Sequence, residues 1–311
     1  MSIFGRSTFS SAGYAAFRPS YPPVLFSRIL SFHNANRAAT ASGGTLLDLG
    51  CGHGLIARAL APSFDSVIAL DPSPGMVEQA KKLTSEHKIV VRQGKAEDLS
   101  FLPDKSVDCV VAGQAAHWFD YSKAWPELAR VVKQGGTLAF WGYKDHVIVG
   151  HPETTPIYDR FVYGSSEPVP GVESMARFWE LPGRDILRDS YRAIALPKQD
   201  WNSETRIAWD PDRASKDIND APEEALWQRK TLKLGELEGY VRTFSAFHGW
   251  QSAHPERKSR AEGGDGDIVD LMFEEVVATV PEWKARGDAW REVEVDVVWG
   301  TVILMARRSQ Q

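Results

Sequence analysis

The stretch Thr45–Gly54, TLLDLGCGHG, decides the fold expected for this chain. A short apolar run of leucines ends in three glycines at alternate positions, and an apolar helical pattern follows from Leu55 to Leu60. Glycines let the backbone turn tightly and approach a ligand closely, because they carry no side chain. An apolar strand, a glycine turn and a helix, in this order, form a nucleotide site at the carboxyl end of the first strand of an α/β sheet.

The spacing of the glycines narrows the choice of ligand. A dinucleotide fingerprint, G-x-G-x-x-G, would need a third glycine where the chain has Leu55, and no phosphate-binding G-x-x-x-x-G-K-[ST] run is present. Asp48 stands two residues before the first glycine. In this form the stretch resembles motif I of the class I S-adenosylmethionine-dependent methyltransferases. The resemblance implies S-adenosylmethionine as cofactor and S-adenosylhomocysteine as product. An ordinary strand–turn–helix corner is the alternative.

The composition is typical of a globular enzyme. The chain has 311 residues, 25% charged and 43% hydrophobic, enough for one large domain or a core with an insertion. A net charge of -5 gives no reason to expect nucleic acid or an anionic membrane as partner, and no apolar run is long enough to span a bilayer. Cys51 and Cys109 both fall in predicted core segments, so neither disulfides nor a metal site are expected. We expect a cytoplasmic monomer or homodimer.

The amino-terminal segment has an unusual composition. The first 47 residues contain no Asp, Glu or Lys, which resembles a mitochondrial transit segment. However, Phe17–Pro23 is stiff and aromatic, and a helical apolar pattern follows from about Val24 to Phe32. We therefore favour residues 1–40 as a structural cap over the cofactor.

Two acidic positions follow the next two predicted strands. Asp71 ends the strand Val67–Leu70, roughly twenty residues after the glycine turn, where an acid accepts hydrogen bonds from ribose hydroxyls. A role limited to starting the next helix is the alternative. After the third strand, Ile89–Val91, many methyltransferases have an aspartate where this chain has Lys95. We therefore expect Glu97 or Asp98, with the Ala96–Glu97 backbone, to meet the adenine ring; a solvated acidic loop is the alternative.

The remaining pattern predicts a Rossmann-like α/β sheet of seven strands with helices on both faces and the last strand antiparallel. The fourth strand is a continuous apolar run of the kind buried on both faces. The chain is expected to end in a hairpin around Gly300. The predicted elements are the strands Val107–Ala112, Thr137–Trp141, Val293–Trp299 and Thr301–Ala306 and the helices Ser122–Val132 and Ile268–Val277.

The segment Gly113–Asp120 follows the fourth strand and lies across the sheet's switch point from the glycine turn. The sulfonium group of the cofactor and the methyl acceptor would meet there, so we predict that His117 and Trp118 line the active site. A histidine packed among aromatic residues for structural reasons is the alternative for His117.

The interval from Tyr143 to about His254 is not needed by a minimal fold of this kind. It is rich in tryptophan, proline and arginine, and an insertion at this point lies above the carboxyl edge of the sheet. We predict a lid over residues 143–254 that supplies the acceptor pocket, and a cofactor-binding core formed by residues 1–142 and 255–311.

Several motifs outside the glycine turn resemble the fungal trans-aconitate methyltransferase group, and together they span nearly the whole chain. They are SxFS and RPSYP near the amino terminus, AHWFD at 116–120, WGY at 141–143, FWELPGR at 178–184, YVRTFSAFHGW at 240–250 and VVWGT at 297–301. The resemblance implies methyl transfer to a carboxylate of a small organic acid, a trans-aconitate-like polyacid, which gives a methyl ester.

The chemistry of this reaction suggests which side chains serve it. A carboxylate is already ionised at neutral pH and needs no general base; it must be taken out of water and aligned with the methyl carbon. Arginine binds carboxylates through two parallel hydrogen bonds, so Arg184 and Arg242 are the candidates. Solvated surface positions are the alternative for both. The aromatic residues Phe9, Tyr14, Tyr21 and Trp118 are expected to shield the sulfonium, and Arg18 to pair with the carboxylate of the cofactor.

Two other functions remain open at this point. A phenol or another hydroxyl acceptor must lose a proton, and His117 would then be the general base. A protein that binds the cofactor without methylating anything is the third possibility. The predicted cofactor-binding residues are Tyr14, Arg18, Asp48, Gly50, Cys51, Gly52, Asp71, Pro72, Met76, Ala96, Glu97, Gln114 and Ala115, and the predicted catalytic residues are His117, Trp118, Arg184 and Arg242.

Overall fold

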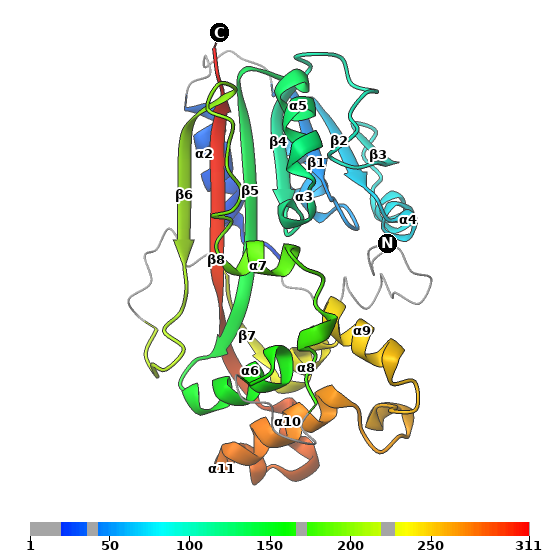
Figure 1. The fold of residues 1–311 in the computed structure, drawn as a ribbon, viewed down its shortest axis with the longest axis vertical. Coiled ribbons are helices and arrows are strands. Elements are labelled where there is room, and N and C mark those ends of the chain that lie inside the picture. Colours follow the sequence, from blue (N-terminus) through cyan, green and yellow to red (C-terminus); the bar gives the residue numbers. More distant parts are fainter. Residues whose placement is uncertain (1–19, 36–42, 166–172, 219–227, 311) are drawn as a thin grey trace.

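The computed structural model describes residues 20–35, 43–165, 173–218 and 228–310, and its centre is one mixed β-sheet (Figure 1). The strand order is β3-β2-β1-β4-β5-β8-β6, and β7 pairs with a second part of β8. Strands β1 to β5 run parallel, whereas β8 is antiparallel to β5, β6 and β7. The strands are β1 (Thr45–Leu49), β2 (Ser66–Asp71), β3 (Ile89–Gln93), β4 (Val107–Gly113), β5 (Val132–Ile148), β6 (Trp201–Trp209), β7 (Arg229–Lys233) and β8 (Glu294–Arg308).

Helices cover both faces of the sheet. Leu46 and Leu47 adjoin each other on β1 but belong to different apolar clusters, because successive side chains of a strand point to opposite faces. Helices α2, α3 and α4 contribute to the first cluster, and α5 and α7 to the second; α5 and α7 lie in front of the sheet in Figure 1 and α2 behind it. These helices are α2 (Pro23–Asn34), α3 (Leu55–Leu60), α4 (Pro74–Leu83), α5 (Tyr121–Val131) and α7 (Gly183–Arg188).

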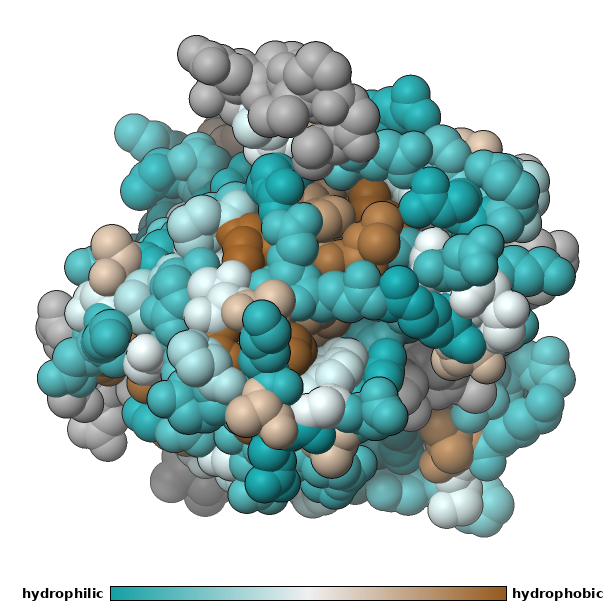
Figure 2. Space-filling model, turned by 90° about the horizontal axis from the view of Figure 1, so that it is seen from below, coloured by the Kyte–Doolittle hydropathy of each residue, from teal (hydrophilic) through white to brown (hydrophobic). Residues whose placement is uncertain are grey.

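A helical layer lies beyond the carboxyl ends of the parallel strands, at the lower end of Figure 1. It stands on the long pair β5 and β8, whose ladder runs from Thr137 opposite Arg307 to Ile148 opposite Val297. Hydrophilic residues cover most of this end of the molecule, and apolar residues show between them near the middle (Figure 2). The layer consists of α6 (Thr155–Tyr163), α8 (Leu234–Val241), α9 (Ser245–Ala253), α10 (Ile268–Thr279) and α11 (Pro281–Lys284).

Six short 3-10 helices complete the described elements. They are η2 (Ala61–Ser63), η3 (Ala116–Trp118), η4 (Pro152–Thr154), η5 (Ala176–Phe178), η6 (Arg260–Glu262) and η7 (Gly287–Glu292).

The structure confirms the predicted fold class, but the predicted carboxyl-terminal hairpin is wrong. Glu294–Arg308 forms one continuous strand through Gly300, whose φ is not in the left-handed region that a tight turn requires. Gly300 instead allows a close approach: a Cβ atom there would lie 2.6 Å from Oδ1 of Asp210. The strand that pairs with the outer edge of β8 is β6, which comes from the middle of the chain.

The interval 143–254, predicted as a lid, also contributes to the sheet. Both β6 and β7 come from this interval and pair with β8. Strand β5 continues to Ile148, whereas the sequence pattern predicted an end at Trp141. The polar residues Lys144, Asp145 and His146 interrupt the apolar pattern but still lie within the strand.

The helical layer is held together by a network of buried charges, the Arg242 network, formed by Arg242, Glu238, Asp267, Asp270 and Arg291. The guanidinium of Arg242 donates hydrogen bonds to all three carboxylates, at 2.9 Å to Glu238 and 2.8 Å to Asp270. Their side chains are 9%, 1% and 2% exposed for Glu238, Asp267 and Asp270. Arg291 adds a bond of 2.8 Å to Glu238, so the network joins α8, α10 and η7. Asp267 also accepts the backbone N–H groups of Val269 and Asp270 at the start of α10.

We expect Arg242→Met to destabilise the protein by about 3–5 kcal/mol, because it leaves buried carboxylates without their main counter-charge. The measurement is urea unfolding at neutral pH. Arg192→Met is the matched control, since the pair of Arg192 with Asp189 lies in solvent, and its unfolding midpoint should stay near that of the wild type. Equal midpoints for the two variants would contradict a stabilising role for the network.

Candidate active site

The glycine turn has the backbone geometry that its sequence predicts. Gly50, Gly52 and Gly54 have φ values of 67°, 53° and 82°, in the left-handed region that other residues rarely adopt. A Cβ atom on Gly50 would lie 2.4 Å from the Cβ of Ala115, so the turn packs tightly against the end of β4. A Cβ atom on Gly52 would meet no atom of the described residues within 4 Å. Among these residues the space before Gly52 is therefore open, which contact with a ligand requires.

Asp71 holds this turn in place from the end of β2. Its carboxylate accepts a hydrogen bond from the backbone N–H of Gly52 at 2.8 Å and another from that of Ser73 at 2.8 Å. Cys51 is tied to the same strand, because its N–H donates to the carbonyl of Leu70 at 2.9 Å. A carboxylate can accept about four hydrogen bonds, so Asp71 retains capacity for ribose hydroxyls. Burial raises the pKa of Asp71, and the two backbone hydrogen bonds oppose this shift.

Asp48 lies beneath the turn rather than beside it. Its side chain is fully buried, and Oδ2 accepts a hydrogen bond from the N–H of Ala57 in the first turn of α3 at 3.1 Å. Oδ1 has no hydrogen-bond partner among the described residues. Burial is the main cause that raises the pKa of Asp48 to about 7, and the nearby charge of Asp71 adds to it. Asp48 thus fixes the start of α3 by accepting one of the backbone N–H groups that have no partner within the helix.

The loop after β3 lies against the start of α5. The carboxylate of Glu97 accepts the backbone N–H of Asp120 at 2.8 Å, and Asp98 accepts the N–H and the hydroxyl of Ser100 in its own turn. Ala96 is buried, with 2% of its surface exposed. Adenine contacts through Ala96 and Glu97 stay a prediction.

Gln114 forms the corner at the end of β4. Its backbone N–H donates to the carbonyl of Trp141 at 2.8 Å, and its side-chain amide makes two bonds to the backbone of Tyr143, at 2.8 and 2.9 Å. The amide of Gln114 therefore holds β5 in place, which is a structural role beside the predicted cofactor contact.

His117 and Trp118 lie in η3 and meet the interval 143–254 there. His117 is 6% exposed, with its ring between Trp118, at 4.6 Å, and Tyr191, at 6.3 Å. Trp118 is 38% exposed, and a Cβ atom on Gly183 would lie 2.4 Å from its ring. The FWELPGR motif, which ends at Arg184, thus contacts the AHWFD motif.

Arg184 lies in an aromatic and largely buried setting. Its side chain is 12% exposed, and its guanidinium lies 4.5 Å from the centre of the Trp179 ring. Nη2 donates to the carboxylate of Asp145 and to the hydroxyl of Tyr163, while Nε is buried without a hydrogen-bond partner among the described residues. Burial alone would raise the pKa of Asp145, but the charges of Arg184 and Arg188 and the Tyr163 hydroxyl outweigh it and lower the pKa.

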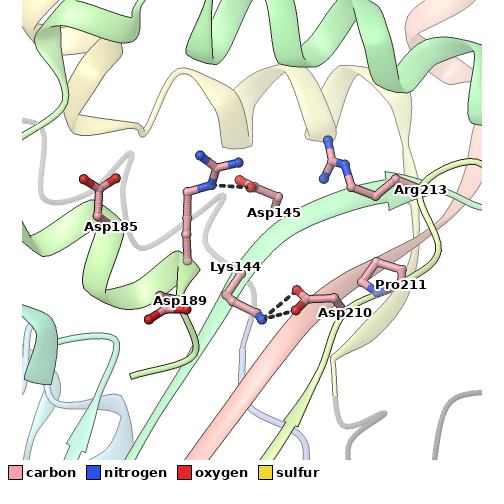
Figure 3. A pocket seen from close by; sticks show the side chains of 8 residues that line it. Lys144, Asp145, Asp185, Asp189, Asp210, Pro211 and Arg213 are labelled. Atoms are coloured by element: carbon pink, nitrogen blue, oxygen red, sulfur yellow. Dashed lines mark hydrogen bonds and ion pairs between the residues drawn. The ribbon is translucent and has the colours of Figure 1, made fainter. Parts of the chain in front are cut away.

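A charged cavity of about 380 Å³ opens beside this group (Figure 3). Its lining includes Lys144 and Asp145 of β5, Arg188 of α7 and Arg213 of the segment after β6. The Nζ of Lys144 is 2.6 Å from the carboxylate of Asp210, a pair that Figure 3 marks. Arg184 and Arg188 of α7 pair with Asp145, and the charge of Arg213 also acts on it, so cationic side chains from two separate segments surround this carboxylate.

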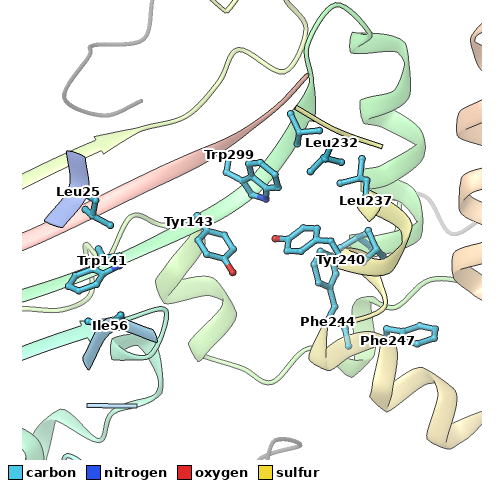
Figure 4. Packing of buried hydrophobic residues seen from close by; sticks show 14 of the residues in the cluster. Leu25, Ile56, Trp141, Tyr143, Leu232, Leu237, Tyr240, Phe244, Phe247 and Trp299 are labelled. Carbon is cyan, nitrogen blue, oxygen red and sulfur yellow. The ribbon is translucent and has the colours of Figure 1, made fainter. Parts of the chain in front are cut away.

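Aromatic residues connect the end of β5 with the helical layer (Figure 4). The rings of Tyr143 and Tyr240 lie on either side of Trp299, at 6.5 and 5.7 Å from it, and their hydroxyl groups are turned toward one another. Tyr240 also contacts Phe244 at 5.0 Å, which in turn lies 5.6 Å from Trp179. An apolar, aromatic wall thus runs from the β5 segment to Arg184.

The structure brings most of the predicted site residues to one edge of the sheet. Tyr14 and Arg18, like Phe9, lie outside the described residues. Tyr21 is described and packs edge-to-face on Trp141 at 5.6 Å. Arg242 belongs to the Arg242 network, where three carboxylates engage its guanidinium, and this arrangement argues against the predicted contact with an acceptor.

Four residues around Arg184 and His117 were not predicted from the sequence: Asp145, Tyr163, Arg188 and Tyr191. None of them stands in a recognisable motif; the position of Asp145 in the polar part of β5 was the one available signal. Among the residues that the structure describes, no group of His, Cys, Asp and Glu side chains could hold a metal ion, and no helix is long and apolar enough to cross a membrane.

Comparisons with known proteins place this chain among methyltransferases by similarity. Residues 47–140, from β1 into β5, match a methyltransferase domain family. The chain is 29% identical over 276 residues to the yeast protein CRG1 of Saccharomyces cerevisiae, described as a probable S-adenosylmethionine-dependent methyltransferase, with 86% of this chain and 87% of CRG1 covered. It is 28% identical over 209 residues to the methyltransferase pgmE of Aspergillus terreus, which covers 64% of this chain and 62% of pgmE. A solved structure from Anaeromyxobacter dehalogenans, described as a candidate type II methyltransferase, matches with a TM-score of 0.61 and 27% identity over 94% of this chain and 98% of that chain.

The fold, the glycine turn with Asp71 and these relatives indicate that the protein is an S-adenosylmethionine-dependent methyltransferase with a Rossmann-like fold. The open space before Gly52 and the remaining acceptor capacity of Asp71 fit the methionine and ribose parts of this cofactor. The cofactor itself supplies the electrophilic methyl group.

Gly52→Ala tests the cofactor site against a matched control, Gly287→Ala. Both glycines have nearly the same φ, 53° and 54°, and a Cβ atom on either would meet no atom within 4 Å in the part of the chain that the structure describes. Each substitution should cost about 1–2 kcal/mol of stability through backbone strain. Calorimetric titration with S-adenosylmethionine should show a loss of affinity of at least roughly tenfold for Gly52→Ala alone, because its methyl group enters the ligand space. Equal affinities in both variants would place the cofactor elsewhere.

The pKa of Asp48 predicts a pH dependence of stability in the absence of cofactor. This pKa lies at about 7 in the folded protein and near 3.8 in the unfolded chain, which corresponds to about 4 kcal/mol. The contribution is fully present below pH 4 and is lost as the pH rises to about 7. Asp48→Asn should therefore match the wild type near pH 4 and exceed it in unfolding free energy at pH 8. A difference between the two proteins that does not change with pH would contradict this.

Proposed function

We propose that the enzyme transfers the methyl group of S-adenosylmethionine to a carboxylate of a small organic acid, giving a methyl ester and S-adenosylhomocysteine. The observation that carries the proposal is the state of Arg184. Its guanidinium is permanently charged, mostly buried and packed on the Trp179 ring, and its buried Nε–H has no acceptor among the described residues. The motif resemblance to the trans-aconitate methyltransferase group supports an aliphatic polyacid as the acceptor.

Arg184 is suited to bind a carboxylate because its existing partners occupy only part of its fork. Asp145 and Tyr163 both bond to Nη2, which leaves the Nε side for a ligand. The Nε of Arg188 also donates to Asp145, at 3.1 Å. Two arginines therefore neutralise this one carboxylate, and the carboxylate of an acceptor would not meet an excess of negative charge. A charge-assisted hydrogen bond in this poorly hydrated setting contributes about 1.5–3 kcal/mol.

The setting of His117 agrees with an acceptor that needs no general base. Its ring is packed between two aromatic rings and the residue is 6% exposed, as expected for a histidine that has a structural role in packing. The task of the protein is then to remove the carboxylate from water and align it with the methyl carbon, and positioning of this kind contributes several kcal/mol. Trp118 and Tyr21 present ring faces and edges near the β4 corner, where a sulfonium cation is stabilised.

The remaining predictions about partners stay predictions: a small-molecule acceptor rather than nucleic acid, and a cytoplasmic monomer or homodimer. The aromatic and apolar wall between Tyr143 and Trp179 favours a small molecule, since a macromolecular acceptor requires an exposed and extended surface.

The direct test offers S-adenosylmethionine with a labelled methyl group to trans-aconitate, related di- and tricarboxylates and a set of phenolic acids. We expect a base-labile methyl ester on an aliphatic acid, identified by mass. Arg184→Lys keeps the charge but loses the fork, and Arg184→Met loses both; each should lower kcat/KM for the acid roughly 10- to 100-fold. The affinity for S-adenosylmethionine should stay unchanged in both.

Two controls accompany this experiment. Arg192→Met, an exposed position just after α7, should leave kcat/KM unchanged. His117→Phe keeps the aromatic packing and removes the imidazole, so it should reduce turnover only modestly. A base-stable ether on a phenol, together with loss of turnover in His117→Phe, would replace the carboxylate with a hydroxyl acceptor.

A further inference from the structure

Strained backbone is concentrated at one place in this molecule. In the part of the chain that the structure describes, five residues other than glycine have positive φ. Lys105 lies in the turn before β4, and Ser203 lies where the register of β6 against β8 shifts, so local turns account for both. The other three are Gln114, Ser190 and Tyr191. Gln114 and Tyr191, from distant parts of the sequence, meet at one short segment of β5, and Ser190 bonds to Lys144 just beyond it.

That segment is Trp141–Tyr143, and its backbone is held from two sides. The carbonyl of Trp141 accepts the N–H of Gln114 at 2.8 Å and the hydroxyl of Tyr191 at 3.1 Å. Between these two contacts lies Gly142, where a Cβ atom would be 2.7 Å from the Tyr191 hydroxyl and 2.8 Å from Oε1 of Gln114. Gln114 and Tyr191 therefore both pack against β5 at Gly142, where no side chain larger than that of glycine fits.

Hydrogen bonds from neighbouring side chains offset the backbone strain at Ser190 and Tyr191. Two consecutive non-glycine residues with φ of 54° and 58° are unfavourable, most of all for a bulky side chain. The Oγ of Ser190 bonds to the buried Nζ of Lys144 at 2.7 Å. Arg206 donates to the carbonyls of Ser190, Tyr191 and Ile194. Strain that the surroundings over-determine in this way is a mark of functional sites.

Tyr191 also contacts His117, which is predicted to line the active site. It is fully buried, and its ring stacks on His117 at 6.3 Å with an angle of 27° between the planes. Burial raises the pKa of the Tyr191 hydroxyl, so this group stays protonated and acts as a hydrogen-bond donor, not as a base. The segment it grips carries Trp141, which contacts Tyr21, and Tyr143, which faces Tyr240.

We infer that Tyr191 is a positioning residue of the methyltransferase: through the Trp141 carbonyl and the His117 ring, it sets the wall against which the acceptor is aligned. It does not bind the cofactor, because the glycine turn and Asp71 are held by separate contacts. Loss of its hydroxyl should therefore affect the rate of transfer and leave cofactor binding intact.

The test compares Tyr191→Phe, which removes the hydroxyl, and Tyr191→Leu, which also removes the ring, with Val276→Ala, a buried control in α10 away from this corner. Kinetics use trans-aconitate and S-adenosylmethionine, and calorimetry measures binding of S-adenosylmethionine. We expect kcat to fall roughly 10- to 100-fold in Tyr191→Phe and further in Tyr191→Leu, since small misplacements cost rate. The KM and dissociation constant for S-adenosylmethionine should stay within about twofold.

Hydrogen exchange supplies a second readout that needs no acceptor. The N–H of Gln114 bonds to the Trp141 carbonyl, so it should exchange faster in Tyr191→Phe and not in Val276→Ala. A kcat and a Gln114 exchange rate equal to those of the control would overturn the inference, as would a loss of cofactor affinity in parallel with kcat. The kinetic arm rests on the carboxylate acceptor proposed above. If no acid is methylated, that proposal fails, and the exchange rate alone decides the role of Tyr191.

Discussion

The antiparallel pairing of β5 with β8 is the interaction on which the rest of the structure depends. Its ladder runs from Thr137 opposite Arg307 to Ile148 opposite Val297, well past the point where β4 ends at Gly113. The two strands therefore project beyond the edge that carries the cofactor site. β7 and the helical layer are built on this projection. Because β5 is continuous, the positions of the cofactor edge and of the charged residues around Asp145 are fixed relative to each other by one strand.

The cofactor half of the site was predictable, since its residues are local in sequence. Each successive strand brings one corner to the same edge, so the order of apolar runs places Gly52, Asp71 and Gln114 near one another without any knowledge of packing. The acceptor half was predictable only in part. Arg184 and Trp118 stood in motifs, but Asp145, Tyr191 and the hydrogen bond of Tyr191 to Trp141 depend on contacts between segments about 50 residues apart, which periodicity does not reveal.

The hairpin predicted around Gly300 failed for a related physical reason. A glycine between two apolar runs is typical of a turn, yet the same residue permits close approach of another segment. Here the approaching group is the Asp210 carboxylate, paired with Lys144, and it comes from the end of β6. Nothing in the sequence around Gly300 distinguishes these two uses, because the deciding neighbour lies 90 residues earlier in the chain. The predicted fold class is still correct, because β8 and β6 occupy the positions in the sheet that were predicted for the two strands of the hairpin.

The number of neighbouring carboxylates distinguishes two arginines that have similar sequence surroundings. Arg184 and Arg242 both stand in aromatic motifs of the same interval, and both are mostly buried. Arg242 faces three carboxylates that are 9% exposed or less, so its fork is saturated and its removal leaves charges that burial makes costly. Arg184 faces one carboxylate, which Arg188 also engages, and retains an N–H donor that no described residue accepts. A buried donor without an acceptor is unfavourable unless a ligand completes it. Arg242 therefore has a structural role in the helical layer, whereas the arrangement around Arg184 is the one that favours the proposed contact with an acceptor.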